Sequence, residues 1–419
     1  MAAFTKILHN RSLVTIGLAE TVSNIGNWIT MMAVFAMVVF RGDGSVAESS
    51  GIFLAGLLPT LLFSPVAGWL LDRFDRKWLM VGSELLSGLI ISGLIFVSRL
   101  ELVYALLALQ AISTSLMTPA RQAIVPDLVQ REDLTRANAF FQQLAGLIKI
   151  GAPMLAGLIL TFMNPHTAII LDVISFGLSA LILSRLPALP PHPMSKPAVS
   201  QPSAQGKDQP SEGVFSVLKS SAALRLLFLT IFLGITVIIG FDVLSSIFIR
   251  DILQGNEQLY GVLIGLVGLG TLASAALLML RREAGSPWKD MIGGILLLTC
   301  VPGAMALAAW LPDPRVGRIL VISGALLGGI GNGFVTVQAG TLLQLYSPAS
   351  VLGRMGGVFQ STAVAGQLIG IVITPLLVPG VLSMGLFFAI SSLALLILAF
   401  YTIFISQKAS YATEVVSAP

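Results

Sequence analysis

The chain has 419 residues, of which 55% are hydrophobic and only 11% are charged, with a net charge of +4. A soluble domain carries roughly 25% charged residues, so this chain lacks the polar surface that an aqueous protein needs. Its mean hydropathy of +0.91 therefore predicts a polytopic membrane protein, and its pI near 9.3 is explained by basic membrane loops rather than by nucleic-acid binding. The single cysteine and the three scattered histidines exclude a disulfide framework and a metal site built on these residues.

Twelve segments are apolar for about the 20 residues that a membrane-spanning helix requires. In chain order they are 12–40, 50–71, 77–98, 102–124, 135–162, 166–186, 222–249, 258–280, 288–311, 316–345, 353–378 and 380–405. The first segment carries polar residues and is long enough to span with tilt, so it is interpreted as a helix and not as a cleaved signal peptide. The predicted fold class is an all-α membrane protein with 12 transmembrane helices in two six-helix bundles.

Lysine and arginine gather in alternate connections between these segments, which sets the orientation. With a cytoplasmic N-terminus, the outside loops hold only Arg41, Arg99, Arg250, Arg315 and Arg318. This bias predicts a multi-pass protein of the cell (inner) membrane with both termini in the cytoplasm.

Residues 187–214 differ from the rest of the chain because they are rich in Pro, Ser and Gln and poor in large apolar side chains. They are typical of a disordered cytoplasmic linker. The predicted domains are an N-terminal bundle at 1–186, this linker, a C-terminal bundle at 215–406 and a cytoplasmic tail at 407–419.

The two predicted bundles share a faint internal repeat. Arg136 is followed by a Phe-Gln pair at 141–142, and Arg354 is followed at the same spacing by a Phe-Gln pair at 359–360. Together with the six-plus-six hydropathy pattern, this favours parallel repeats related by an axis along the membrane normal.

The stretch "GWLLDRFDRKWLM" crowds charge into the predicted cytoplasmic turn between the second and third helices. Its basic residues, Arg73, Arg76 and Lys77, fit an inside loop, but its acids do not. Asp72 ends a helix where the dipole is already negative, so it needs a compensating partner: Arg73, Arg76 or the N-terminus of another helix. Gly68 allows a neighbouring helix to approach. A docking point at a helix interface and a solvated loop anchor are both open interpretations.

The spacing Gly68-x-x-x-Asp72-Arg73-x-x-Arg76-Lys77 resembles the loop 2–3 signature of the major facilitator superfamily. The resemblance implies that the motif latches the two halves on the cytoplasmic side in the outward-facing state. A candidate cytoplasmic gate then includes the motif residues and three further arginines, Arg121, Arg136 and Arg354.

Other stretches resemble the branch of enterobactin exporters and macrolide-efflux proteins, among them "SNIGNW", "LPTLLFSPVAG", "TPARQAIVPDLV" and "YGVLIGLVGLG". Two departures limit what the branch implies. Residues 102–118 lack the arginine that antiporters often carry in helix four, with Arg121 placed only at the cytoplasmic end, and the helix-five antiporter motif is reduced to "GAPMLAG". Proton antiport is thus an expectation drawn from the resemblance.

Polar residues inside the predicted helices are candidates for a substrate or proton site, since an ionisable residue at mid-helix costs about 2.5–3.5 kcal/mol on insertion scales. Glu20, Asn24 and Asn27 lie on one face of the first helix. These polar side chains are interpreted either as part of the transport site or as helix-packing contacts. Lys149 lies about midway along the fifth helix, either paired with Glu20 or acting separately in a cavity. Asp242 in the seventh helix is interpreted as a gate or cation-attracting group, or as a partner of Arg250.

Two other acids are interpreted as structural. Asp172 lies near the start of the sixth helix, where the dipole favours an anion. Glu84 is placed close to the cytoplasmic face, where a loop arginine can pair with it. Four amides are cavity candidates with helix packing as the alternative: Asn332, Gln338, Gln360 and Gln367.

The predicted function is a secondary transporter that exports a hydrophobic or amphipathic small molecule by proton antiport with alternating access. A lipid or lysolipid flippase and a siderophore exporter are alternatives within the same fold. A receptor or an intramembrane enzyme is the alternative of a different class, but no HExxH, GxSxG or Walker A pattern occurs. The expected partners are a small-molecule substrate, protons and the bilayer, with no cofactor and no nucleic acid, and the expected state is a monomer.

Overall fold

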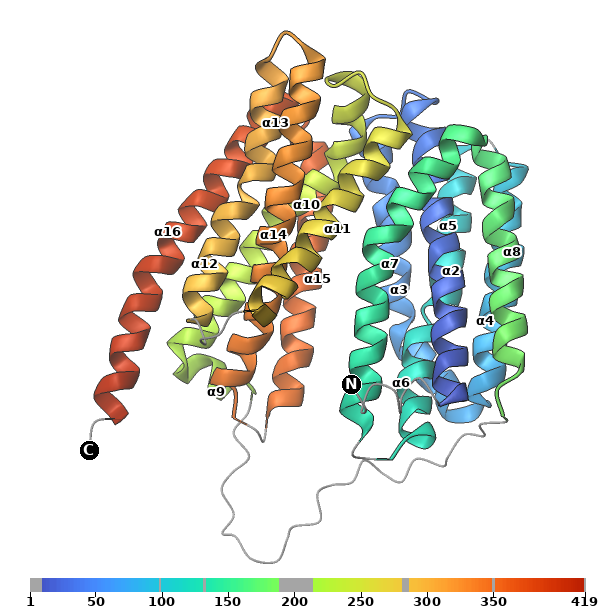
Figure 1. Ribbon diagram of the computed structural model, residues 1–419, viewed down its shortest axis with the longest axis horizontal. Coiled ribbons are helices and arrows are strands. Elements are labelled where there is room, and N and C mark those ends of the chain that lie inside the picture. Colours follow the sequence, from blue (N-terminus) through green and yellow to red (C-terminus); the bar gives the residue numbers. More distant parts are fainter. Residues whose placement is uncertain are drawn as a thin grey trace, which may run out of the picture. The chain divides into compact units, whose positions relative to one another are not determined.

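The computed structural model in Figure 1 describes residues 10–97, 99–130, 133–187, 214–280, 286–348 and 351–417. The side chains of Asp72, Arg136, Gln142 and a few other residues in these ranges, and all those after Ser406, lie outside the description. Over the described residues every regular element is a helix.

The helices before the predicted linker are α2 (Arg11–Phe35) with its π-helical extension η1 (Ala36–Phe40), α3 (Val46–Arg73), α4 (Arg76–Ser92) with η2 (Gly93–Ile95), α5 (Leu100–Thr114), α6 (Met117–Leu128), α7 (Leu134–Phe162) and α8 (Pro165–Ser184). Those after it are α9 (Val214–Ser220), α10 (Ala222–Asp251), α11 (Glu257–Leu280), α12 (Pro287–Leu298), α13 (Cys300–Trp310), α14 (Pro314–Tyr346), α15 (Leu352–Leu377) and α16 (Met384–Ser417). Colours in Figure 1 follow this order from blue to red.

These elements supply 12 helices in the described residues that are long and apolar enough to cross a membrane, which confirms the predicted fold class. Most boundaries differ from the prediction by only a few residues. The fifth span differs most, since the described span runs over Gln143–Phe162 where 135–162 was predicted, and the fourth span runs over Leu100–Leu128, four residues beyond its predicted end at 124.

The chain divides into two compact units. One comprises Met1–Gly44 and Gly51–Lys207, and the other comprises Ser45–Ser50 and Asp208–Pro419. The predicted linker at 187–214 lies almost wholly outside the described residues, so its disorder stays a prediction.

Within the N-terminal unit, α2 packs against α7 and α8, and α4 packs against α5 and α8. One apolar cluster of this unit joins α2, α6, α7 and α8 through buried side chains such as Leu13, Ile124, Phe141 and Leu183. Within the C-terminal unit, α14 packs against α11, α12 and α13, while α10 packs against α15 and α16.

Two of the membrane spans are broken by proline. Pro119 has no amide hydrogen to donate, and its ring conflicts with the carbonyl of the residue four positions earlier, so the chain leaves the helix between α5 and α6. Pro302 has the same effect on the junction of α12 and α13 at Thr299.

Side chains at the turns satisfy the first amides of several helices. Asn10 accepts hydrogen bonds from the amides of Ser12 and Leu13, and its own side-chain amide donates to the Leu128 carbonyl at 2.9 Å. This residue therefore caps α2 and ties its start to the end of α6. Asn164 and Asp313 cap α8 and α14 in the same manner, each followed by a proline.

Glycines on α14 allow close helix contact in the C-terminal unit. A Cβ at Gly329 would overlap the backbone carbonyl of Val267 on α11, and a Cβ at Gly331 would overlap the carbonyl of Gly294 on α12. Small residues at helix interfaces permit this approach, and van der Waals contact between helices is a main source of stability in lipid. By contrast, a Cβ at Gly340 on the same helix would meet nothing within 4 Å.

Gly329→Ala should therefore lower the stability of the protein by roughly 1–3 kcal/mol, because its methyl group displaces backbone rather than a flexible side chain. Gly340→Ala is the matched control and should be neutral or slightly stabilising, since alanine is a better helix former than glycine. Thermal unfolding of both variants in the same detergent micelles provides the comparison. Equal melting temperatures for the two variants would contradict the close contact at Gly329.

Candidate functional site

The most prominent polar contact in the N-terminal unit is an ion pair between membrane-spanning helices. The Arg121 Nε on α6 donates to the Glu20 Oε1 on α2 at 2.7 Å. The two side chains are only 16% and 12% exposed. The guanidinium also lies over the ring of Phe141 on α7, 4.6 Å from its centroid, so three helices meet at this group.

The position of Arg121 corrects the sequence analysis, which placed it at the cytoplasmic end of the fourth helix. Because α6 continues past the break at Pro119, Arg121 lies seven residues before its end at Leu128. That distance is about 10 Å along a helix. Arg121 therefore lies inside the fourth span, about two turns from its end, whereas residues 102–118 of that span contain no arginine, as the sequence showed.

The partner of Glu20 in the described residues is thus Arg121. Lys149, which was considered as a partner of Glu20, is exposed on α7. A role for Lys149 in binding substrate stays a prediction.

The other polar residues on the predicted face of α2 have different contacts. The exposed Asn24 donates from its side-chain amide to the carbonyl of Glu20 at 2.7 Å, within its own helix. Asn27 accepts a hydrogen bond from the side-chain amide of Gln110 on α5. Gln110 was not among the residues predicted from the sequence, although a lone amide within an apolar run is a usable signal.

Two acids interpreted as structural lie in the interior of this unit. Glu84 on α4 is only 3% exposed. This buried position does not fit the predicted pairing of Glu84 with a loop arginine near the cytoplasmic face. Asp172 on α8 is fully buried and accepts a hydrogen bond from the Thr30 hydroxyl at 2.6 Å.

Polar candidates in the C-terminal unit fall into two groups. Gln338 is buried and donates to the Asp290 carboxylate at 3.0 Å, which is a helix-packing contact. Asn332 donates to the Thr271 hydroxyl at 3.3 Å and also borders a cavity. Gln360 is exposed and Gln367 half-buried on α15.

Asp242 is half-buried on α10, and its charge lies near the buried Tyr260 of α11. Arg250, its proposed partner, donates two hydrogen bonds to the adjacent Asp251 at 2.6 and 3.2 Å.

The cavity beside Asn332 has a volume of about 190 Å³ and lies within the C-terminal unit. Most of its wall is apolar, formed by side chains of α10, α12, α14, α15 and α16 such as Ile235, Ile295 and Leu398. Thr230 and Thr336 join Asn332 as its polar groups. Its composition suits the apolar part of a small molecule, held by few polar contacts.

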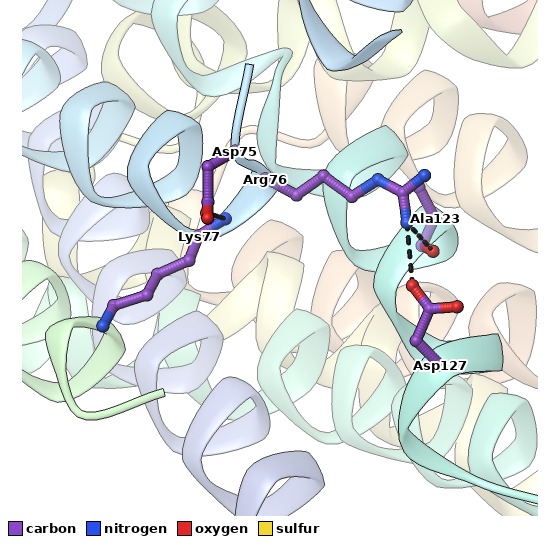
Figure 2. Close-up of polar contacts among 5 residues, drawn as sticks. All are labelled: Asp75, Arg76, Lys77, Ala123 and Asp127. Atoms are coloured by element: carbon purple, nitrogen blue, oxygen red, sulfur yellow. Dashed lines mark hydrogen bonds and ion pairs between the residues drawn. The ribbon is translucent and has the colours of Figure 1, made fainter. Parts of the chain in front are cut away.

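Figure 2 shows how the charged turn after α3 is held. Arg76 Nη1 donates to the Asp127 carboxylate and to the Ala123 carbonyl of α6, both at 2.9 Å. Lys77 is buried and its Nζ donates at 2.6 Å to the Leu186 carbonyl, just beyond the end of α8. Asp75 caps α4 by accepting from the Lys77 amide at 2.9 Å. The turn thus fastens α4 to α6 and to the end of α8.

The remaining gate candidates have fewer described contacts. Arg73 is exposed and lies over the ring of Trp69, 4.4 Å from its centroid. A Cβ at Gly68 would meet nothing within 4 Å among the described residues, and the helix approach expected there stays a prediction. Arg354 is exposed, and the side chains of Asp72 and Arg136 lie outside the described residues.

Among the described residues, no group of three or more His, Cys, Asp or Glu side chains is placed to hold a metal ion. What the site offers instead is a carboxylate, a guanidinium and several amides within membrane-spanning helices, which suits reversible binding and proton exchange.

Comparison with known proteins shows that the chain is similar to membrane transporters. The model of the Major Facilitator Superfamily matches residues 16–362. The chain is 27% identical over 362 residues to an MFS-type transporter, YfiS, of Bacillus subtilis, a match that covers 86% of this chain and 85% of that protein. It is 31% identical over 182 residues to macrolide efflux protein A of Streptococcus pyogenes, covering 42% of this chain and 45% of that protein.

The crystal structure of the nucleoside transporter NupG superposes with a TM-score of 0.70 at 12% sequence identity. That match covers 94% of this chain and 98% of NupG. At so low an identity, the likeness shows the fold alone.

Removal of either partner of the Glu20–Arg121 pair should destabilise the protein, because the other charge is then left without its partner in a largely dry site. In a double-mutant cycle with Glu20→Gln and Arg121→Gln, we expect a coupling energy of roughly 0.5–3 kcal/mol. The measurement is unfolding in mixed micelles. A cycle of Glu20→Gln with Lys149→Gln serves as control and should be additive; coupling to Lys149 but not to Arg121 would reverse the assignment.

Proposed function

The chain belongs to the Major Facilitator Superfamily of transporters, and from that premise we propose that it exports a hydrophobic or amphipathic small molecule in exchange for protons. As a family member with 12 helices able to cross a membrane, it is a multi-pass membrane protein and a transporter of small molecules, not an enzyme. The substrate class, the coupling ion and the direction are the proposal.

The observation that carries proton coupling is the Glu20–Arg121 pair at 2.7 Å. A guanidinium stays charged in proteins, so Arg121 needs an anionic or polar partner whenever it is inside the membrane. Protonation of Glu20 neutralises that partner and frees Arg121 for water, for a polar group of the substrate or for another side chain. One proton thereby changes what the site can hold, which is the requirement for coupling two ligands.

The amphipathic substrate is supported by two features. The cavity beside Asn332, within the C-terminal unit, is apolar on most of its wall. The membrane spans of the chain carry few fixed charges. Macrolide efflux protein A, a relative over part of the chain, is named for the efflux of macrolides. Few charges and an adaptable apolar wall suit polyspecific binding.

The charged turn is proposed to belong to the cytoplasmic gate. Arg76 and Lys77 hold the turn on the N-terminal unit through Asp127 and Leu186. A turn fixed in this way offers the rigid support that a latch requires.

Transport driven by a pH gradient is the direct test. Proteoliposomes with an acidic interior should accumulate a radiolabelled macrolide, and a protonophore should abolish the accumulation. Glu20→Gln mimics the protonated carboxyl at nearly constant volume, so it should lose accumulation but retain macrolide binding measured in detergent. Glu101→Gln is the matched control, because Glu101 is exposed in the first turn of α5, and it should accumulate normally.

Accumulation by Glu20→Gln at the wild-type level would remove Glu20 from the coupling step, and Asp242 would be the next carboxylate to test. Movement of a lipid probe without any pH gradient, in the absence of macrolide flux, would support a flippase instead.

The proposed topology places both termini and residues 187–214 in the cytoplasm of the cell, in the inner membrane, with the chain acting as a monomer. After replacement of the native Cys300, a cysteine at Ser203 should react with an impermeant maleimide only in inside-out vesicles, because the linker then faces the cytoplasm. A cysteine at the exposed Ser45, between the first two membrane spans, is the control and should react in intact cells. Labelling of the Ser203 position in intact cells would overturn the orientation.

A further inference from the structure

A second acidic centre lies in the interior of the N-terminal unit. Asp172 on α8 is fully buried, and its two carboxyl oxygens accept hydrogen bonds from Thr30 at 2.6 Å and from Ser175 at 3.0 Å. A Cβ at Gly26 on α2 would overlap both Asp172 and Ser175. The carboxylate is therefore pressed directly against the backbone of α2.

Glu84 lies between the same helices and is less well satisfied. It is 3% exposed, and its Oε2 has no hydrogen-bond partner among the described residues. The hydroxyls of Ser23 on α2 and Ser179 on α8 lie beside its carboxyl group. Ser179 and Ser87 are themselves fully buried with hydroxyls that have no partner among these residues. A buried carboxylate oxygen thus faces hydroxyl groups in a dry interior.

The charged groups around Glu84 further disfavour its ionised form. Asp172 faces it from α8 and Glu20 from α2, and both are acids. The cations of this region are held by other groups, since Arg121 of α6 lies on Glu20 and Lys77 of α4 donates to the Leu186 carbonyl. From α5, Ser113 donates to the Ser83 carbonyl rather than to the carboxylate.

Two carboxylates in one dry site cannot both be ionised at low cost, because each loses hydration and repels the other. A proton on either group removes one charge. It also converts an acceptor into a donor, and the neighbouring serine hydroxyls can accept that hydrogen bond.

We propose that Glu84 and Asp172 form a proton-binding site that holds one proton on one of its two carboxyl groups and exchanges it through Glu20. Glu20 and Ser23 lie one turn apart on α2, so the path from the ion pair to Glu84 is short, about 4.5 Å along the helix axis. The proton leaves water, sits on Glu20 and then on a carboxyl oxygen of the buried pair, and returns to water by the same groups. No other bond changes, and Arg121 regains the Glu20 carboxylate once the proton has moved inward.

The exchange through Glu20 rests on the proposed function, but the buried proton can be detected without transport. Infrared difference spectra of the protein in nanodiscs should contain the C=O stretch of a protonated carboxylic acid at neutral pH. Glu84→Gln should remove that band. Glu101→Gln, which changes an exposed glutamate at the start of α5, should leave it unchanged.

Stability against pH gives a second readout. A folded state that holds a proton which the unfolded chain releases loses stability as the pH rises above the range in which an unfolded glutamate ionises, so the melting temperature of the wild type should fall between about pH 5 and 8. Glu84→Gln, the neutral isostere, should show a flatter profile over that range and should fold at least as well as the wild type at its upper end. Identical profiles would count against the site.

A wild-type spectrum without the acid band at neutral pH would overturn the proposal, whatever the variants do. So would stabilisation of the wild type, but not of Glu84→Gln, by sodium against choline at constant ionic strength, because the site would then bind a cation. A band that persists while macrolide transport ignores the pH gradient would support the buried proton site and remove the proposed antiport. Antiport without the band would support the proposed function and remove the buried proton site.

Discussion

The low polarity of the membrane interior is the constraint on which the polar architecture depends. A charge there is costly unless a partner and hydrogen bonds replace its hydration. Glu20 and Arg121 meet this requirement together, with the ring of Phe141 against the guanidinium. The same requirement makes the pair sensitive to protonation, because neutralising one member leaves the other without its partner.

The charged turn meets the same constraint at the membrane boundary. Arg76 and Lys77 donate to groups at the ends of α6 and α8. Carbonyls at helix C-termini have no partner in their own helix and carry partial negative charge, so lysine binds there favourably. The concentration of charge in this short segment therefore has a structural explanation within one unit, whether or not it also latches the two units.

The buried acids have positions that the local sequence pattern did not predict. In the sequence, Glu84 looked like a residue near a helix end with loop arginines available to it. The structure turns it inward because α4 packs on α8 through this face, and it leaves one carboxyl oxygen facing Ser179 rather than a cation. The fourth predicted span ended at residue 124, before the helix itself did, because α6 continues through Pro126 to Leu128, and Arg121 therefore lies deeper in the span than the sequence indicated. Gln110 was missed because one amide in an apolar run has no periodic partner along the chain.

By itself, the sequence determined the twelve spans and the fold class, because hydropathy over about 20 residues reports a local property, the cost of leaving backbone and side chains in lipid. It also placed Glu20 and Asn27 on one face of the first helix, since the helical period is local too. Only the tertiary structure decided that Arg121 rather than Lys149 meets Glu20, that Gln110 meets Asn27, and that Glu84 and Asp172 share an interior. Those pairings join residues that are 83 or more positions apart, as Asn27 and Gln110 are, so they depend on which helices pack together and in which rotation. That choice is made by contacts such as those at Gly26 and Gly329, where the absence of a side chain allows two helices to touch.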